Sequence, residues 1–214
     1  MLGVSDGLIT NVSLILGVAG ANTSPGGVRL AGLGGLLAGA FSMAAGEYVS
    51  MKAQRELLER ELHMEKVELH RAPDAERAEL IQLYESRGID PGVAEELASE
   101  MMRTPEMALE THAREELGVN PAELGNPYAA AWASAASFAA GAVLPLVPWF
   151  ITRGAAAVIA SVVLGAIVAI AIGVALGRYT GRSVLRSGFR QVLVTMSAAG
   201  VTFLVGRAVG SSIS

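Results

Sequence analysis

The feature that most constrains this chain is an abrupt change of character around residues 43–52. Residues 28–41 are apolar and glycine-rich, and Arg29 is their only charge. Residues 56–79, in contrast, are densely charged and mainly acidic. Neither proline nor a cluster of turn residues separates the two parts, so we expect one helix that leaves a lipid bilayer and continues into water. A membrane exit lined with carboxylates indicates a path for cations.

Five segments are long and apolar enough, or nearly so, to cross a bilayer, which takes about 20 helical residues. They are residues 4–21, 28–51, 128–151, 155–176 and 187–209. The mean hydropathy of +0.46 is too high for an ordinary soluble domain. Pro145 and Pro148 should kink or end the third span, and Trp149 is expected at the bilayer interface. The sequence predicts an all-α membrane protein with five transmembrane helices.

Residues 52–127 form an acidic insert between the second and third spans. The insert has 18 of the 20 acids and 9 of the 16 bases, a charge of −9, whereas the rest of the chain carries +5. Its turn residues predict four helices: one continuing from the second span to Arg71, one capped by Asp74, one starting at Asp90-Pro91, and one running from Thr104-Pro105 to Gly118. We therefore divide the chain into residues 1–51, with two spans, 52–127, a helical metal-binding domain, and 128–214, with three spans.

The distribution of arginines between the short loops predicts the orientation. The link between the fourth and fifth spans is crowded with arginines, at positions 178, 182, 186 and 190, whereas the other two short links have one each. The positive-inside bias places the crowded link in the cytoplasm. The N-terminus and the insert are then cytoplasmic and the C-terminus is outside. Composition rich in alanine, glycine and arginine indicates a bacterial inner membrane.

Two pairs of glutamates in the insert are spaced to share helix faces. Glu65 and Glu68 form one pair, and Glu76 and Glu79 form the other, with a break at residues 72–74 between them. If the chain folds back at this break, four carboxylates converge, and they repel one another unless a cation lies among them. The alternative is a solvated acidic hairpin without a ligand.

Asp6 and Glu47 are the only acids in or near the apolar spans. Ionisable residues inside a membrane are costly and usually mark an ion or proton path. Met43 lies four residues before Glu47 on the same helix face, and a thioether beside carboxylates favours a transition metal. The alternatives are a helix cap for Asp6 and lipid or core packing for Met43.

Three motifs carry a resemblance to a known family. They are Asp6-Gly7-Leu8-Ile9-Thr10, Met43-Ala44-Ala45-Gly46-Glu47-Tyr48 and Glu116-Leu117-Gly118. Together with the five-span layout, they make the chain resemble the vacuolar iron transporter family. The resemblance implies a homodimeric, proton-coupled exporter, not an enzyme, with no prosthetic group. Its cargo would be Fe²⁺ or a related divalent ion such as Mn²⁺, Zn²⁺ or Co²⁺.

The resemblance also assigns site residues. Asp6 and Met43 match the family's translocation path, and its cytosolic metal ligands match the glutamates at positions 65, 68, 76, 79 and 116. Where plant members have two methionines before the Glu-Leu-Gly segment, this chain has His112 and Ala113. An imidazole could replace one thioether as a ligand, whereas Ala113 could not replace the other.

Other functions fit the sequence less well. A di-iron carboxylate enzyme needs Glu-x-x-His pairs, and each of the three histidines has a different residue at that spacing. Nucleic-acid binding is excluded because the insert is acidic. A membrane-anchored acidic module that binds a partner or buffers metal, without transport, explains the insert but leaves Asp6 and Glu47 unexplained.

Small residues in the first span suggest how a homodimer could form. Gly3 and Gly7 are spaced i, i+4, as are Gly17 and Ala21, so two copies could approach closely through this helix and bring two Asp6 side chains together. The alternative is that these residues pack the first span against its own chain.

Overall fold

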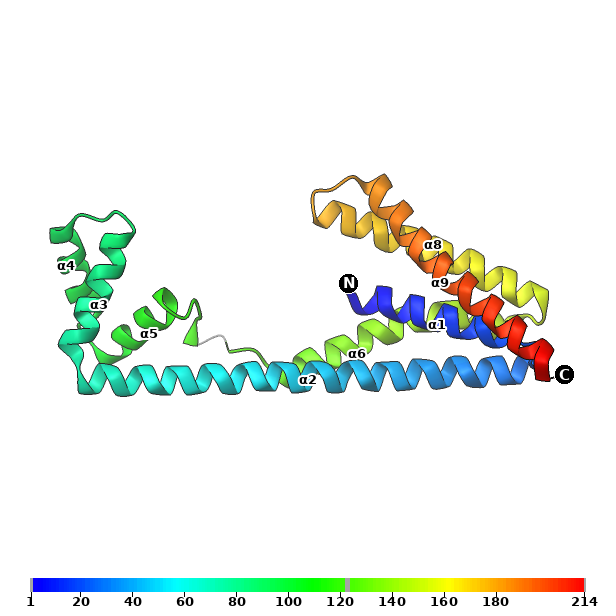
Figure 1. The fold of residues 1–214 in the computed structure, drawn as a ribbon, viewed down its shortest axis with the longest axis horizontal. Helices are drawn as coiled ribbons and strands as arrows, with labels where there is room; N and C mark the ends of the chain where they lie inside the picture. Colours follow the sequence, from blue (N-terminus) through cyan, green and yellow to red (C-terminus); the bar gives the residue numbers. More distant parts are fainter. Residues whose placement is uncertain (1, 122–123, 214) are drawn as a thin grey trace. The chain divides into compact units, whose positions relative to one another are not determined.

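The computed structural model describes residues 2–121 and 124–213, and their regular secondary structure is helical (Figure 1). In chain order the elements are α1 (Leu2–Gly20), α2 (Pro25–Arg71), α3 (Pro73–Ser86), α4 (Pro91–Met101), α5 (Pro105–Glu115), α6 (Pro127–Val143), the 3₁₀ helix η2 (Leu144–Leu146), α7 (Pro148–Ile151), α8 (Ala155–Tyr179) and α9 (Val184–Ile213). Contacts divide the chain into two compact units. We call residues 1–48 with 128–214 the membrane unit, and residues 49–127 the insert unit.

Five helices are long and apolar enough to cross a bilayer, namely α1, α2, α6 with η2, α8 and α9. This confirms the predicted all-α membrane protein with five spans. α2 is a single helix of 47 residues, which confirms that the change from apolar to acidic sequence occurs without a break.

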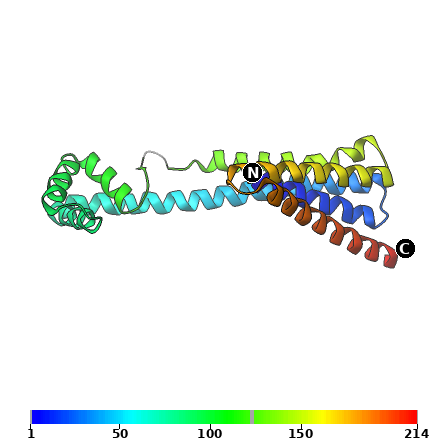
Figure 2. The same ribbon diagram turned by 90° about the horizontal axis from the view of Figure 1, so that it is seen from above.

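In the membrane unit, α1 packs against both α8 and α9, and α8 packs against α9 (Figure 2). Glycines allow the closest of these approaches. A Cβ added at Gly7 would overlap the carbonyl oxygen of Phe138 on α6, and one at Gly206 of α9 would overlap that of Gly17. The backbones of α1, α6 and α9 are therefore in direct contact, as small residues permit in membrane helices.

The third span is interrupted as its prolines predict. α6 ends at Val143, Pro145 lies in the 3₁₀ turn, and Pro148 is the first residue of α7. Trp149, which is predicted to lie at the bilayer interface, is the second residue of α7. Its side chain is buried in a core cluster with Ile15, Val28, Leu146 and Ala157.

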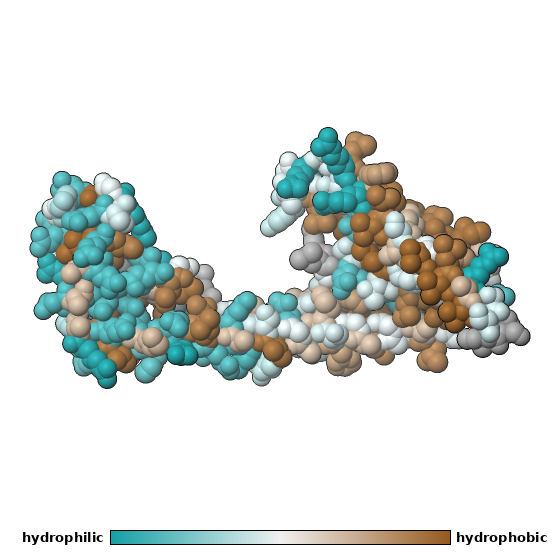
Figure 3. Space-filling model, in the orientation of Figure 1, coloured by the Kyte–Doolittle hydropathy of each residue, from teal (hydrophilic) through white to brown (hydrophobic). Residues whose placement is uncertain are grey.

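The remaining apolar surface of the membrane unit faces outward. α8 and α9 expose a series of large aliphatic side chains, including Ile159, Ile167, Leu193, Val201 and Leu204. Figure 3 shows this as brown surface over α8 and α9. Such a continuous apolar surface matches helices that lie against lipid.

The insert unit has its own small core. Leu80 and Tyr84 of α3 pack against Ala94 and Ala98 of α4. The ion pair of Arg77 with Glu95, 2.9 Å between nitrogen and oxygen, also joins α3 to α4. An ion pair of Arg87 and Glu115 ties the end of α3 to the end of α5.

Most of the predicted helix starts in the insert unit are confirmed. Asp90 accepts a hydrogen bond from the amide of Gly92 at 3.0 Å, and Thr104 accepts one from that of Met107 at 3.2 Å. Two expectations were wrong. α3 begins at Pro73, so Asp74 lies in its first turn rather than capping it, and α5 ends at Glu115 rather than at Gly118. Pro at the first helical position explains the earlier start of α3.

Candidate metal centre

His112 lies at the centre of the predicted glutamate cluster. It belongs to the last turn of α5 and is fully buried. Glu65 of α2 is 7% exposed and Glu76 of α3 is 9% exposed, whereas Glu116 directly follows α5. Three separate stretches of the insert unit therefore present carboxylates to one imidazole.

The distances within this cluster are short. Nδ1 of His112 lies 3.0 Å from Oε1 of Glu116, 3.2 Å from Oε1 of Glu65 and 3.8 Å from Oε2 of Glu76. We call these four residues the carboxylate–histidine cluster.

The cluster has more buried acceptors than donors. Nδ1 of His112 can share one proton, and its hydrogen bond is with Glu116. Oε1 of Glu65 and Nε2 of His112 are buried and make no hydrogen bond with any of the residues described. A buried acceptor in that position is costly unless a proton or a metal ion reaches it.

The environment also disfavours ionised carboxylates in the absence of a metal ion. Burial raises the pKa of Glu65 to about 7, the neighbouring His112 partly opposes this rise, and the charges of Glu116, Glu76 and Glu68 add to it. Burial likewise raises the pKa of Glu76, to which Glu79, Glu68 and Glu116 also contribute. Both carboxyl groups therefore hold protons at higher pH than an ordinary glutamate does.

The spacing of the donor atoms suits a first-row divalent metal ion. Two donors that each lie about 2.1 Å from one ion are about 3.0 Å apart at a right angle and about 3.4 Å apart at the tetrahedral angle. The separations of 3.0 and 3.2 Å from Nδ1 to the two Oε1 atoms fall in this range. Glu65, His112 and Glu116 each offer a donor, and these donors all lie within 4.8 Å of one another.

Glu68 and Glu79 lie at the surface of the insert unit, unlike Glu65 and Glu76, which are buried. The two exposed residues both raise the pKa of Glu76 through their charge. They add negative potential at the edge of the carboxylate–histidine cluster, which attracts cations to it. From the sequence, His112 was predicted only as a replacement for one methionine of the family. A histidine on an amphipathic helix gives no further signal, because its central place depends on how α2, α3 and α5 pack.

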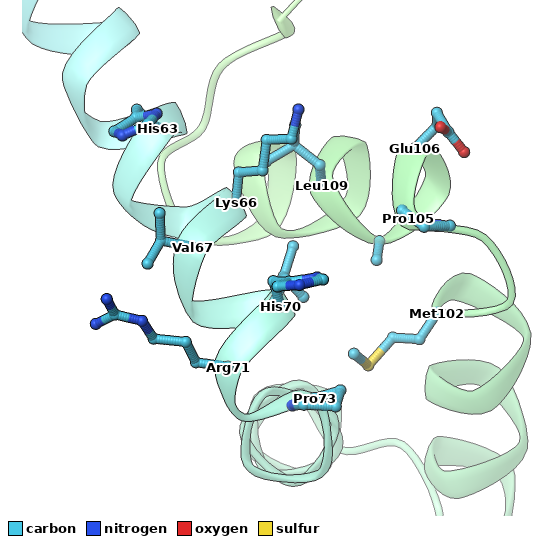
Figure 4. Close-up of a pocket in the computed structure, with 12 residues that line it drawn as sticks. His63, Lys66, Val67, His70, Arg71, Pro73, Met102, Pro105, Glu106 and Leu109 are labelled. Carbon is cyan, nitrogen blue, oxygen red and sulfur yellow. The ribbon is translucent and has the colours of Figure 1, made fainter.

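A second cavity in the insert unit has different chemistry. Figure 4 shows His63, Lys66 and His70 along one side of α2. They face Met102, which directly follows α4, and Leu109 of α5. Among the described residues that line this cavity, Glu106 is the one acid. The face of α2 that carries these residues differs from the face that carries Glu65 and Glu68.

The three predicted path residues lie on two helices of the membrane unit. Asp6 is exposed on α1 and accepts a hydrogen bond from the hydroxyl of Thr10 at 3.5 Å. On α2, Met43 is half-buried and Glu47 is exposed. Asn11 of α1 is fully buried, and its amide nitrogen donates to the carbonyl oxygen of Ala142 at 2.6 Å.

The small residues proposed for a dimer contact pack against other helices of the same chain. Gly3 and Gly7 face Ser137 and Phe138 of α6, and Gly17 faces Thr202 of α9. Ala21 lies against Gly210 of the same helix α9. The expectation that these residues form an intermolecular contact was therefore wrong, because α1 uses them to pack inside its own bundle.

Comparison with known proteins places the chain in a family. A family model described as the VIT family matches residues 1–207. The chain belongs to the VIT family. This confirms the resemblance seen in the sequence, and membership of a VIT family of transporters confirms that the chain is not an enzyme.

Curated VIT relatives are similar over different lengths. Vacuolar iron transporter 1 of Eucalyptus grandis is 32% identical over 212 residues, covering 99% of this chain and 85% of the relative. Vacuolar iron transporter 1 of Arabidopsis thaliana is 31% identical over 98% of this chain and 84% of the relative. The vacuolar iron transporter of Acanthamoeba castellanii is 38% identical over 147 residues, 69% of this chain, which spans 52% of that relative.

Proposed function

We propose that this VIT-family chain exports Fe²⁺, and also Mn²⁺, from the cytosol in exchange for protons. The observation that carries the proposal is the buried Oε1 of Glu65, which faces His112 and Glu116 without a hydrogen bond from any residue that the structure describes. A divalent cation supplies the positive charge that this cluster lacks. Several relatives are named vacuolar iron transporters, which supports iron as the cargo.

The donor set restricts the cargo to transition metals. Mg²⁺ and Ca²⁺ prefer oxygen ligands alone, whereas an imidazole with carboxylates suits Fe²⁺, Mn²⁺, Zn²⁺ and Co²⁺. Zn²⁺ binds such sites more tightly than Fe²⁺ or Mn²⁺, so availability in the cytosol decides which ion is carried. We propose that the insert captures metal through Glu65, Glu76, Glu116 and His112, with Glu68 and Glu79 as outer carboxylates.

Asp6, Met43 and Glu47 form the proposed path in the membrane unit. Glu47 and Met43 lie one turn apart on α2, so a cation can pass from a carboxylate to a thioether. Asp6 then exchanges the cation for protons, because it is the other acid of the membrane unit and its hydrogen-bond partner Thr10 is neutral. The crowded arginines at residues 178–190 support a cytoplasmic insert and N-terminus, and hence outward export.

We propose that a second copy covers the one exposed stripe of α1. Asp6, Thr10 and Leu14 are exposed at i, i+4 and i+8, whereas Leu8, Val12 and Ile15 between them are fully buried. A two-fold contact along this stripe brings two Asp6 carboxylates to one axis, where a shared proton or metal ion offsets their repulsion.

Flux measurements in liposomes test the proposed function. The purified chain is reconstituted into liposomes that contain a metal-sensitive dye. Fe²⁺ flux should be faster when the proton gradient drives protons in the direction opposite to the metal. Empty liposomes and liposomes with an Asp6→Asn protein are the controls. Metal binding without flux in the reconstituted wild type would overturn the transport proposal in favour of a membrane-anchored buffering module.

A further inference from the structure

The turn between α8 and α9 and the first turns of α9 line an open cavity at one end of the membrane unit. α8 ends at Tyr179 and α9 begins at Val184, so only four residues join two helices that pack along each other. A cavity of about 460 Å³ lies here. The cavity is lined by Arg182, Ser183, Arg186, Ser187 and Arg190.

The charge of this cavity is uncompensated within the membrane unit. Residues 128–214 contain no acid at all, and the whole membrane unit contains only Asp6 and Glu47. Among the residues that the structure describes, Arg182, Arg186 and Arg190 take part in none of the ion pairs. Three guanidinium groups around one cavity repel one another, so an anion from outside the chain would stabilise them.

The donors of the cavity match a phosphate group. Guanidinium groups bind phosphate oxygens in a bidentate manner, which makes arginine the usual residue for this task. Ser183 and Ser187 add hydroxyl donors, and the cavity lies at the N-terminus of α9, a helix of 30 residues whose dipole also favours negative charge.

The surroundings of the cavity indicate that the phosphate belongs to a lipid. Tyr179 and Leu185 are each 86% exposed and Phe189 is 71% exposed, although all three lie beside the arginines in sequence. Figure 3 shows hydrophilic atoms gathered at the end of the α8–α9 hairpin, directly next to brown apolar surface. Because α8 and α9 lie against lipid, a phosphate bound beside these apolar side chains is next to acyl chains, as the phosphate of a phospholipid head group is.

We propose that this cavity, which we call the arginine pocket, binds the phosphate head group of an anionic phospholipid, with its acyl chains along α8 and α9. The pocket is built from residues 182–190 and shares no residue with the carboxylate–histidine cluster or with Asp6, Met43 and Glu47. Lipid binding here fastens the end of the hairpin to one leaflet of the bilayer.

Thermal unfolding of the detergent-purified chain tests this proposal. The added probes are dioleoylphosphatidylglycerol, dioleoylphosphatidylcholine and inorganic phosphate. Phosphatidylglycerol should raise the unfolding midpoint saturably, whereas the other two probes should have little effect. In the double variant Arg186→Gln with Arg190→Gln, the apparent affinity for phosphatidylglycerol should fall by about thirtyfold. Arg207→Gln removes the same kind of charge further along α9, and it should leave the response unchanged.

The outcomes are distinguishable. An equal response to inorganic phosphate would overturn the assignment to a lipid, and an equal response of the double variant to phosphatidylglycerol would overturn the pocket itself. If the double variant does not fold, Arg182→Gln replaces it, because Arg182 lies in the turn outside both helices. Native mass spectrometry then counts retained phosphatidylglycerol. Fewer lipids on Arg182→Gln than on Arg207→Gln support the proposal, and equal numbers contradict it.

Discussion

Oε1 of Glu65 lies 3.2 Å from Nδ1 of His112, yet it accepts no hydrogen bond within the described part of the chain. The reason is that the imidazole nitrogen already shares its proton with Glu116, 3.0 Å away. A carboxylate oxygen buried in this way is stabilised by a proton at low pH or by a metal ion at higher pH. This competition underlies the first two predictions.

Replacement of His112 by alanine should weaken Mn²⁺ binding by about tenfold or more, because the site loses its only nitrogen donor. Isothermal titration of the full-length chain in detergent measures the affinity, and circular dichroism checks that the helices remain. His63→Ala is the matched control, since His63 belongs to the other cavity of the insert unit. Equal affinities of the two variants would remove His112 from the set of ligands.

The stability of the metal-free chain should fall as the pH rises from about 4.5 to about 7. In this window the folded state retains the proton on Glu65, whose pKa is raised to about 7, whereas the unfolded chain with a pKa near 4.5 has lost it. The folded state therefore binds more protons, and its free energy of unfolding decreases with pH until it levels off above about 7. Thermal unfolding in a chelator, at pH values on both sides of this window, measures the effect.

Metal ions should reverse this dependence, because they displace the proton from Glu65 and bind more tightly as the pH rises. Glu65→Gln should flatten both trends, since the amide neither titrates nor carries charge. Glu85→Gln, at an exposed position of α3, should preserve them. A Glu65→Gln protein with the full pH dependence of the wild type would show that another group is responsible.

Asp6→Asn and Met43→Leu should each reduce Fe²⁺ flux in liposomes to below about a tenth of the wild-type rate while leaving metal binding by the insert intact. Both changes keep the size of the side chain nearly constant, so folding should survive. In Asp6→Asn, the remaining flux should no longer respond to the proton gradient. In Met43→Leu, the remaining flux should still respond to it. Near-normal flux in the Asp6→Asn protein would exclude this aspartate from the proton step.

Single cysteines can test the proposed dimer, because the chain has no native cysteine. Leu14→Cys lies on the exposed stripe of α1 and should form a cross-link between two copies in native membranes. Leu8→Cys is the control, since Leu8 is fully buried in its own chain. Efficient cross-linking at both positions, or at neither, would contradict a contact along Asp6, Thr10 and Leu14.

Helices were predictable from the sequence because the residues that start and end them act locally. Prolines 91 and 105, the caps Asp90 and Thr104, and long apolar runs act within a few residues of their own position. The wrong prediction at Asp74 is also local, because it misplaces the start of one helix by only a few residues. Ala72 and Asp74 could each cap this helix, and the structure has Pro73 as its first residue.

Tertiary neighbours were much less predictable. The glycines of α1 indicate a close contact, but nothing in their spacing says whether α6 or a second copy provides it. The same holds for Trp149, which is buried by residues of α1, α2 and α8 that are distant in the sequence. Charge spacing identified the glutamates, whereas the central place of His112 arises from the packing of three helices.

The glycine contacts of α1 also say which part of a transporter can move. A transporter must open to each side of the bilayer in turn. The backbones of α1, α6 and α9 are in direct contact at Gly7 and Gly206, so we expect these three helices to move together. The glycines of α2 meet only the ends of side chains, such as those of Ile15 and Leu146 at Gly32, and side chains can change rotamer.

We therefore expect α2, which carries Met43 and Glu47, to be the sliding helix against a fixed frame of α1, α6 and α9. A cysteine pair at Gly32 and Ile15, joining α2 to α1, should stop Fe²⁺ flux when it is oxidised, and reduction should restore it. A pair at Gly17 and Thr202, joining α1 to α9, should leave flux unchanged. The close backbone packing that holds three of the five spans together would then give α2 a fixed surface along which to move.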